Sequence, residues 1–205
     1  MYLMISKNMT VQLIPVFPSP ILISEVENFK GTKKELVNWI KKYQKTQDNF
    51  QVSGRNAWQS PRNFSIVENS FLKYRTLIEK KTADMMYSFT DNEYKIENMW
   101  INVNSPNGYN VSHTHPQSDL SAVLWINSPQ RSGKLCFTSP NVFPQHKTIE
   151  RCRENIKQSL NYHHDFWIEP DEGKIIIFPS NLIHFVDVNE SKEDRISISF
   201  NINLI

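Results

Sequence analysis

Three of the six histidines in this 205-residue sequence are placed where they could bind one metal ion. His113 and His115 are separated by one residue, and on an extended segment this spacing points both imidazoles to the same side. His184 lies far downstream in the strand-like run 182–186; alone, it would be more typical of a hydrogen-bonded core histidine. Together, the three would offer a transition metal three neutral nitrogen ligands. The remaining histidines are expected on the surface or in loops: His146, His163 and His164.

Polar side chains alternate with apolar ones along two strand-like segments, 94–104 and 195–204. In the first segment Asn102 and Asn104 share a face, and we predict that they line a pocket. In the second segment the shared polar positions are Arg195, Ser197, Ser199, Asn201 and Asn203. A polar face inside a β protein is unusual unless it lines a site. The alternatives are structural asparagines in the first segment and a solvent-facing edge strand in the second.

The second half of the sequence must supply the scaffold for these residues. From Tyr94 onward, short alternating segments are separated by turn residues, a pattern typical of an all-β sandwich or barrel. The turn residues Ser105-Pro106-Asn107-Gly108 are expected to end the first strand. The predicted strands are 94–104, 120–127, 134–138, 166–169, 174–178, 182–188 and 195–204.

The first half combines short strands, predicted at 11–16 and 21–26, with two helices. Thr32 and Glu35 form a capping box that predicts a helix start. An apolar stripe at helical spacing follows it, made of Leu36, Trp39, Ile40 and Tyr43. A second helix is predicted over residues 65–87.

Composition excludes several classes of protein. With 23 basic and 21 acidic residues the formal charge is +2, and the basic residues are scattered, so nucleic-acid binding is not expected. Of the two cysteines, Cys136 lies in an apolar run typical of a buried reduced thiol, which favours the cytoplasm. No window approaches the roughly 20 apolar residues of a membrane span, so neither membrane insertion nor secretion is expected.

In order and spacing, the motifs from about Trp100 to the C-terminus resemble those of the iron(II)- and 2-oxoglutarate-dependent oxygenases. The ending, 195–202, is especially similar to a subgroup from bacteria and their viruses in which a His-x-His-Pro segment begins the site. The matching segments are Ser112-His113-Thr114-His115, 120–127, 132–137, 173–180 leading into His184, and 195–202.

The resemblance implies roles for individual residues. Arg195, helped by Ser197, would bind the far carboxylate of 2-oxoglutarate, because a planar guanidinium can make two parallel charge-assisted bonds to a carboxylate. Asn102 and Asn104 would meet oxygens of the same cosubstrate. The positions expected at the substrate pocket are Trp58, Trp125 and Asn201.

One metal ligand departs from the broad family. Where a carboxylate is expected after the first histidine, this sequence has His115, so the ligands would be His113, His115 and His184. The ligand set would then carry one negative charge less than the usual set of two histidines and one carboxylate. Asp119 is the alternative ligand, if residues 116–118 curl back.

We therefore expect a mainly β, α+β protein with a double-stranded β-helix (jelly-roll, cupin-like) core and N-terminal helices packed against one sheet. Residues 1–205 would form a single domain, in which 1–93 supply supporting strands and helices and 94–205 carry the metal site. The resemblance implies a cytoplasmic dioxygenase using Fe(II), 2-oxoglutarate and O2. It would hydroxylate an unactivated C–H bond of a small molecule or protein side chain, releasing succinate and CO2; a homodimer is compatible with the sequence.

Two other classes of protein remain open from the sequence. A cupin-like metalloenzyme or metal-binding jelly roll that does not use 2-oxoglutarate would share the three histidines, but it would not need Arg195. A non-catalytic β-sandwich binding module would contain the histidines as structural residues only and would bind no metal.

Overall fold

The computed structural model describes residues 19–140, 143–160 and 165–205, so the strand predicted at 11–16 lies outside the described part. Nine strands form one antiparallel sheet in the order β1-β7-β4-β9-β3-β8-β5-β6, with β2 paired to β3. The strands are β1 (Leu22–Glu25), β2 (Gly54–Gln59), β3 (Tyr94–His113), β4 (Leu120–Asn127), β5 (Leu135–Thr138), β6 (Asp165–Ile168), β7 (Lys174–Pro179), β8 (His184–Val186) and β9 (Arg195–Leu204).

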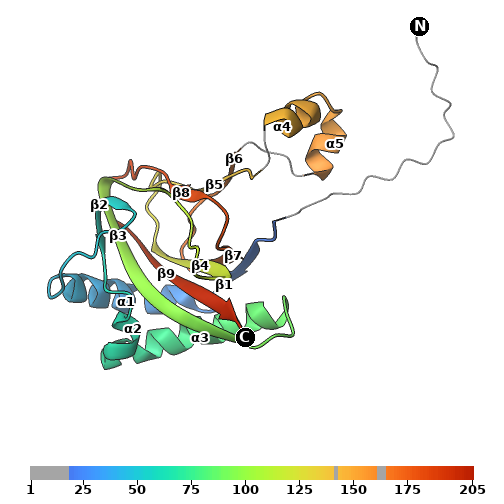
Figure 1. Cartoon of the computed structure of the whole chain (residues 1–205). Coiled ribbons are helices and arrows are strands. Elements are labelled where there is room, and N and C mark those ends of the chain that lie inside the picture. Colours follow the sequence, from blue (N-terminus) through green and yellow to red (C-terminus); the bar gives the residue numbers. More distant parts are fainter. Residues whose placement is uncertain (1–18, 141–142, 161–164) are drawn as a thin grey trace, which may run out of the picture.

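The long strand β3 joins the two halves of the sheet. Its first part pairs with β9, from Tyr94 opposite Leu204 to Asn104 opposite Arg195. Its last part pairs with β8, where His113 lies opposite His184. Since one strand takes part in both pairings, the sheet curls into a half-barrel (Figure 1). This is the jelly-roll architecture expected from the sequence.

The prediction that the turn residues 105–108 end the first strand is wrong, because β3 continues to His113. These four residues instead form an irregularity, since Asn104 pairs with Ala57 and Tyr109 pairs with Arg55. Asn107 has a positive φ of 66°. A Cβ at Gly108 would lie 2.5 Å from the carbonyl oxygen of Asn56, so only glycine fits this close approach. The turn chemistry produces a bulge that re-aims the strand toward β8.

The helical segments before β3 cover one face of the sheet, as predicted (Figure 1). In the helix predicted from the apolar stripe, Leu36, Ile40 and Tyr43 are buried, and Trp39 packs against them. The helices are α1 (Phe29–Gln44), α2 (Phe64–Val67), the 3-10 helix η1 (Asn69–Phe71) and α3 (Leu72–Tyr87). Two further helices, α4 (Phe143–Glu150) and α5 (Glu154–Ser159), lie apart from them beyond β6 (Figure 1).

Two helix predictions are wrong, namely the start of the first helix and the continuity of the second. The first helix begins at Phe29 rather than after Thr32, because Phe29 is buried against Gly173 and starts the helix through tertiary packing. The second predicted helix is interrupted at Glu68, whose φ and ψ of −94° and 89° are not helical. The interruption brings the rings of Phe64 and Phe71 to 4.7 Å from one another.

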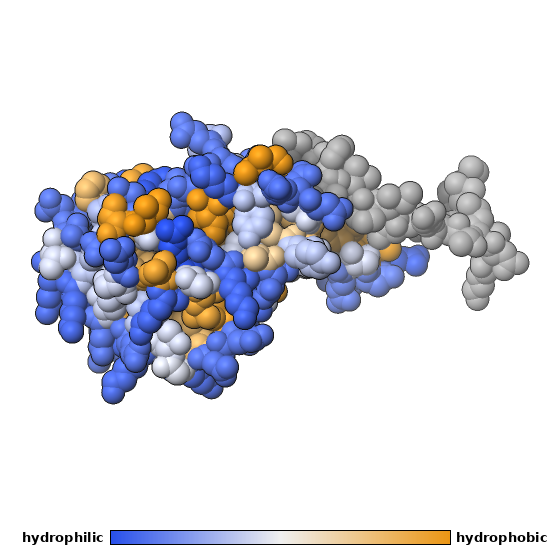
Figure 2. All heavy atoms as spheres, turned by 90° about the horizontal axis from the view of Figure 1, so that it is seen from below, coloured by the Kyte–Doolittle hydropathy of each residue, from blue (hydrophilic) through white to orange (hydrophobic). Residues whose placement is uncertain are grey.

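The helix-covered side, seen from below in Figure 2, is mostly hydrophilic with small separate apolar patches. Exposed apolar side chains on these helices include Ile66, Val67 and Leu72. Among the helices that the structure describes, none combines the length and apolarity needed to cross a membrane.

The two faces of the central strands have different environments. The apolar residues Ile196, Ile198, Phe200 and Ile202 of β9 pack with Met99, Ile101 and Val103 of β3 in the core beneath the helices. The alternating polar residues of β9 and β3 face the concave side of the sheet, where Asn102, Arg195 and Ser197 line a cavity. The predicted alternation of both strands is confirmed, and 195–204 is an interior strand rather than a solvent-facing edge.

Candidate metal centre

The end of β3 and the start of β8 bring the three predicted histidines together. His113 and His184 are cross-strand partners. His115 lies two residues beyond His113, and its backbone N–H donates to the carbonyl of Ser180 at 2.9 Å. The ring centroids are 4.3 Å apart for His113 and His184, and 5.2 Å for each pair that includes His115. One ligand nitrogen from each ring lies within 4.8 Å of the other two. This spacing allows the three imidazoles to share one metal ion.

Hydrogen bonds to the Nδ1 atoms determine which nitrogen each ring offers. The Nδ1 of His113 lies 2.7 Å from the carbonyl oxygen of Val111, and the Nδ1 of His184 lies 2.8 Å from that of Leu182. A carbonyl oxygen only accepts, so both Nδ1 atoms carry the proton. The Nε2 lone pairs of these two rings are therefore left for a ligand bond.

His115 is oriented by a buried network of side chains. Its Nδ1 lies 2.6 Å from Oδ1 of Asn201 and 2.9 Å from Oγ of Ser121. The Ser121 hydroxyl donates to the same Asn201 oxygen at 3.1 Å, and the Ser180 hydroxyl lies 2.7 Å from Ser121. If Ser180 donates to Ser121, every proton has an acceptor and the His115 Nδ1 donates to Asn201. His115 then offers Nε2, as the other two rings do.

Burial keeps these imidazoles neutral. It lowers the pKa of His184 to about 3, helped by the neighbouring His113, while the hydrogen bond to Leu182 acts in the opposite direction. Burial is also the largest cause that lowers the pKa of His113 and of His115, with a further lowering by the positive charge of Arg62. At neutral pH all three rings are neutral, so each keeps one nitrogen free of a proton, as metal binding requires.

Asp119, the alternative ligand, has a different role in the structure. Its side chain is exposed, and Oδ2 accepts a hydrogen bond from the backbone N–H of Leu204 at 2.9 Å. Among the described residues, the group of ligand atoms within 4.8 Å of one another contains the three histidines and no carboxylate. The Asp119 carboxylate therefore stabilises the end of β9 through a hydrogen bond and lies outside this group.

Arg195 is a buried cation whose two terminal nitrogens, Nη1 and Nη2, have different surroundings. Its side chain is only 2% exposed, and Nη1 donates to the carbonyl of Ser132 at 2.6 Å, with longer contacts to the carbonyls of Gly133 and Asp187. Nη2 is buried and has no hydrogen-bond partner in the described part of the chain. Burial lowers the pKa of Arg195 to about 10, partly offset by Asp187, so the guanidinium stays charged at neutral pH. An anionic ligand would complete its hydrogen bonding.

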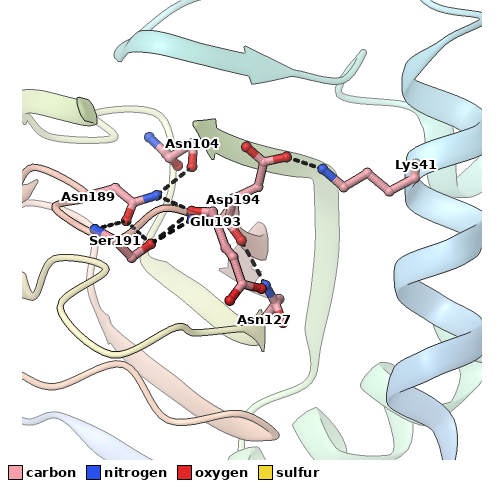
Figure 3. A network of polar contacts seen from close by, with 7 residues as sticks. All are labelled: Lys41, Asn104, Asn127, Asn189, Ser191, Glu193 and Asp194. Carbon is pink, nitrogen blue, oxygen red and sulfur yellow. Dashed lines mark hydrogen bonds and ion pairs between the residues drawn. The ribbon is translucent and has the colours of Figure 1, made fainter. Parts of the chain in front are cut away.

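A polar network fixes the chain immediately before Arg195 (Figure 3). The buried Asn189 side chain donates to the carbonyls of Asn104 and Glu193, at 3.0 and 2.8 Å. Asn127 donates to the carbonyl of Asp194 at 2.8 Å, and the Asp194 carboxylate pairs with Lys41 of α1. Strand β9 therefore starts from a position tied to β3, β4 and the helix layer.

Gly133 makes room for the Arg195 side chain. It has a φ of 92°, and a Cβ there would lie 2.3 Å from the carbonyl oxygen of Asp187 and 2.7 Å from Nη1 of Arg195. We expect Gly133→Ala to lower the free energy of unfolding by about 1–3 kcal/mol, measured by chemical denaturation. Gly31→Ala is the matched control, because Gly31 lies in α1 with no atom within 4 Å of a new Cβ and should gain about 0.5–1 kcal/mol. Equal stabilities of the two variants would contradict this explanation.

The other predicted site residues fall into two groups. Asn102, Trp125 and Ser197 line the same cavity as the histidines and Arg195, which we call the inner cavity. Asn104 does not line the inner cavity. Its Nδ2 donates to the side chain of Asn110, and Asn110 does line the cavity. Trp58 is also absent from the cavity lining, because it pairs with Val103 and therefore takes the core face of β2. The next residue, Gln59, takes the opposite face and donates to Asn102 at 2.8 Å.

A second depression, which we call the outer groove, shares His113, His115 and Trp100 with the inner cavity. Arg62 and Asn201 also line it, and its exposed members, such as Gln117, show that it reaches the surface. Sequence reasoning did not identify Arg62, which lies outside every motif. The sequence also did not predict that Ser121 and Ser180 are buried beside His115, because their burial depends on the pairing of β4 with β7. The environments of His146, His163 and His164 fall outside what the structure describes.

Comparison with known proteins supports the fold and the kind of site. The sequence model of a family described as "Putative 2OG-Fe(II) oxygenase" matches residues 98–201, while no curated protein sequence matches the chain. HygX from Streptomyces hygroscopicus, solved with nickel, 2-oxoglutarate and hygromycin B, has a TM-score of 0.63 at 9% identity, over 90% of this chain and 83% of HygX.

Two prolyl hydroxylases have the same fold. The viral collagen prolyl hydroxylase of Paramecium bursaria Chlorella virus-1, in complex with 2OG, has a TM-score of 0.57 at 18% identity, over 89% of this chain and 94% of that chain. The enzyme of Trichoplax adhaerens, in complex with a hypoxia inducible factor peptide fragment, has a TM-score of 0.61 at 8% identity, over 89% of this chain and 83% of that chain. The jelly-roll fold predicted from the sequence is therefore confirmed.

Proposed function

Because the chain belongs to the 2OG-Fe(II) oxygenase family, we propose that His113, His115 and His184 hold the iron(II) and that Arg195 holds the distal carboxylate of 2-oxoglutarate. The observation that carries this proposal is the Nη2 of Arg195, which has no hydrogen-bond partner among the described residues and is a buried cationic donor in the cavity that the three histidines also line. Neither a cupin-like metalloenzyme without this cosubstrate nor a binding module needs such a group.

The residues of the inner cavity fit a small dianion beside a metal. Arg195 and the metal lie in one cavity, so the two ends of 2-oxoglutarate would each meet a positive charge. Ser197 lines the cavity two residues further along β9, and Asn102 lines it from β3. Trp125 is 2% exposed and forms an apolar wall that keeps bulk water from the cosubstrate.

Iron(II) with 2-oxoglutarate and O2 supplies the oxidising chemistry, and the chain supplies binding, orientation and exclusion of water. We propose that the outcome is hydroxylation of an unactivated C–H bond with release of succinate and CO2. The outer groove is lined by His113 and His115, reaches the surface at Gln117 and would admit the substrate. We propose a small molecule or a protein side chain as the substrate, which are the classes represented by the ligands of HygX and of the Trichoplax enzyme.

The ligand set has a consequence for charge. Three neutral imidazoles leave both positive charges of iron(II) uncompensated, whereas a carboxylate ligand would cancel one of them. The site should therefore bind the dianionic cosubstrate with more electrostatic attraction than a site with two histidines and a carboxylate. The fixed Nδ1–H groups of His113 and His184 add ligand basicity through their carbonyl partners.

An anaerobic titration tests the proposal. The purified chain, without an affinity tag, is titrated with iron(II) and then with 2-oxoglutarate by calorimetry, and succinate release is measured after O2 is admitted. We expect one metal ion per chain and one 2-oxoglutarate that binds only to the metal-loaded protein. Metal binding without 2-oxoglutarate binding would favour the cupin-like alternative, and absence of stoichiometric metal would favour the binding module.

Asn201 should act as a positioning residue for His115. Asn201→Ala removes the oxygen that accepts from Nδ1, so iron(II) affinity should fall by roughly 10–100-fold, as measured by anaerobic calorimetry. The matched control is Asn203→Ala, on the same strand and face, whose Oδ1 accepts instead from the backbone N–H of Asp119. Equal iron affinities in the two variants would show that Asn201 does not orient the ligand.

A further inference from the structure

We propose that the outer groove binds an anionic group of the oxygenase's primary substrate and that Arg62 is the residue that binds it. This inference rests on the proposed function, since it assigns a chemical class to the substrate that the groove admits. The shared chemistry is a carboxylate or phosphate group held in the outer groove, which His113 and His115 also line.

Arg62 is placed beside the histidines by an aromatic platform. Its guanidinium carbon lies 4.8 Å from the ring centroid of Trp100, and that ring lies 5.6 Å from the ring of His115. Trp100 is only 6% exposed, so the platform is fixed, while the Arg62 side chain itself is exposed. Stacking on a rigid ring holds the guanidinium in place while its N–H edges stay available to a ligand.

The charge of Arg62 is not neutralised by the part of the protein that the structure describes. None of the carboxylates in the described ranges forms an ion pair with it. Glu97 lines the same groove but pairs with Lys95 at 3.3 Å. A cation next to a metal site favours an anionic partner.

The cosubstrate does not account for Arg62. The inner cavity has its own buried arginine, Arg195, and Arg62 is not among the residues that line that cavity. Arg62 lines the outer groove and the adjoining surface depression, which also contains Phe50 and Val52. The two arginines would therefore serve two separate ligands, one in the inner cavity and one in the outer groove.

A second group in the groove points to a ligand with a hydrogen-bond donor. The Oδ1 atom of Asn98 is buried and has no hydrogen-bond partner in the part of the chain that the structure describes. Asn98 lines the outer groove together with Arg62. An N–H or O–H of the substrate would satisfy this oxygen. The substrate would thus combine an anionic group with a neighbouring donor.

The test uses the full chain loaded with zinc(II) and saturated with 2-oxoglutarate, so that Arg195 is already occupied. The probe is N-acetylglycine, which carries a carboxylate and an N–H, and its uncharged twin is N-acetylglycinamide. Methyl phosphate is the second anion and tells a phosphate preference from a carboxylate preference. Binding is followed by the NMR signal of the Trp100 indole N–H, assigned by its loss in Trp100→Phe.

We expect a saturable shift of this signal with an anionic probe, and at least tenfold weaker binding of the uncharged twin. Arg62→Gln should weaken anion binding at least tenfold, and Arg62→Lys should weaken it less, because it keeps the charge but loses the planar fork. Arg75→Gln, which alters an arginine of α3 paired with Glu79, should bind like the wild type. If neither anion gives a saturable shift, or if Arg62→Gln binds as well as the wild type, the proposal is overturned.

The same samples separate this inference from the proposed function. Binding of 2-oxoglutarate is measured by calorimetry before the probe is added. Failure of 2-oxoglutarate to bind would count against the proposed function, while the Arg62 variants would still decide whether the outer groove is an anion site.

Discussion

Replacing His184 with alanine should abolish stoichiometric iron(II) binding. His184 is 4% exposed, lies opposite His113 in the sheet, and would contribute one of the three proposed ligand nitrogens. Loss of an outer partner of a metal ligand typically costs 10–100-fold in affinity, so loss of the ligand itself should cost more than about 100-fold. Metal content is measured by elemental analysis after anaerobic reconstitution, and circular dichroism shows whether the variant is folded.

Asp119→Ala is the control that decides between the two ligand hypotheses. Its carboxylate accepts from the backbone of Leu204 and lies outside the histidine group, so this variant should retain one iron(II) per chain. If Asp119→Ala loses the metal and a folded His184→Ala variant retains it, the assignment of the ligands is wrong.

The second large effect is expected from Arg195→Gln. This variant removes the only Lys, Arg, Asp or Glu side chain among the described residues that line the inner cavity, and each hydrogen bond to a charged group contributes about 1.5–3 kcal/mol. Two such bonds correspond to a loss of 2-oxoglutarate affinity of roughly 100-fold or more, measured by calorimetry on the iron-loaded protein. Iron(II) affinity without cosubstrate should stay within a few-fold of the wild type.

Two further variants make this result specific. Arg195→Lys keeps a positive charge but cannot offer two parallel bonds, so its affinity should lie between those of Arg195→Gln and the wild type. Arg131→Gln, which changes an exposed arginine paired with Glu190, should leave cosubstrate binding unchanged. An Arg195→Gln protein that is folded and binds 2-oxoglutarate normally would remove the main support for the proposed function.

The sequence was most informative where local alternation and burial agree. The strands 120–127 and 195–204 have the predicted bounds, and the two faces of β9 divide between core and cavity as expected. Both faces are covered by other parts of the protein, so the period-two pattern is strictly enforced. The convergence of His113 and His184 depends on the pairing of β3 with β8, and it could be expected only from the resemblance to a family.

Features that depend on long-range strand pairing or tertiary packing were not predicted from the sequence. Trp58 was expected at the substrate pocket, but the register of β2 on β3 turns it to the core and turns Gln59 to the cavity side. The capping box at Thr32 was overridden by burial of Phe29, since a few hydrogen bonds at a helix start weigh less than a buried aromatic ring. Arg62 comes from the segment between β2 and α2 and reaches the site only through tertiary packing.

The division of the site into two cavities makes its parts separable by engineering. Arg195 and Ser197 belong to β9 and Trp125 to β4, in the centre of the sheet, whereas Arg62 and Gln117 belong to connecting segments. Connecting segments tolerate replacement better than central strands do. Exchange of these segments between homologous scaffolds should therefore redirect the choice of substrate while the machinery that activates oxygen stays intact.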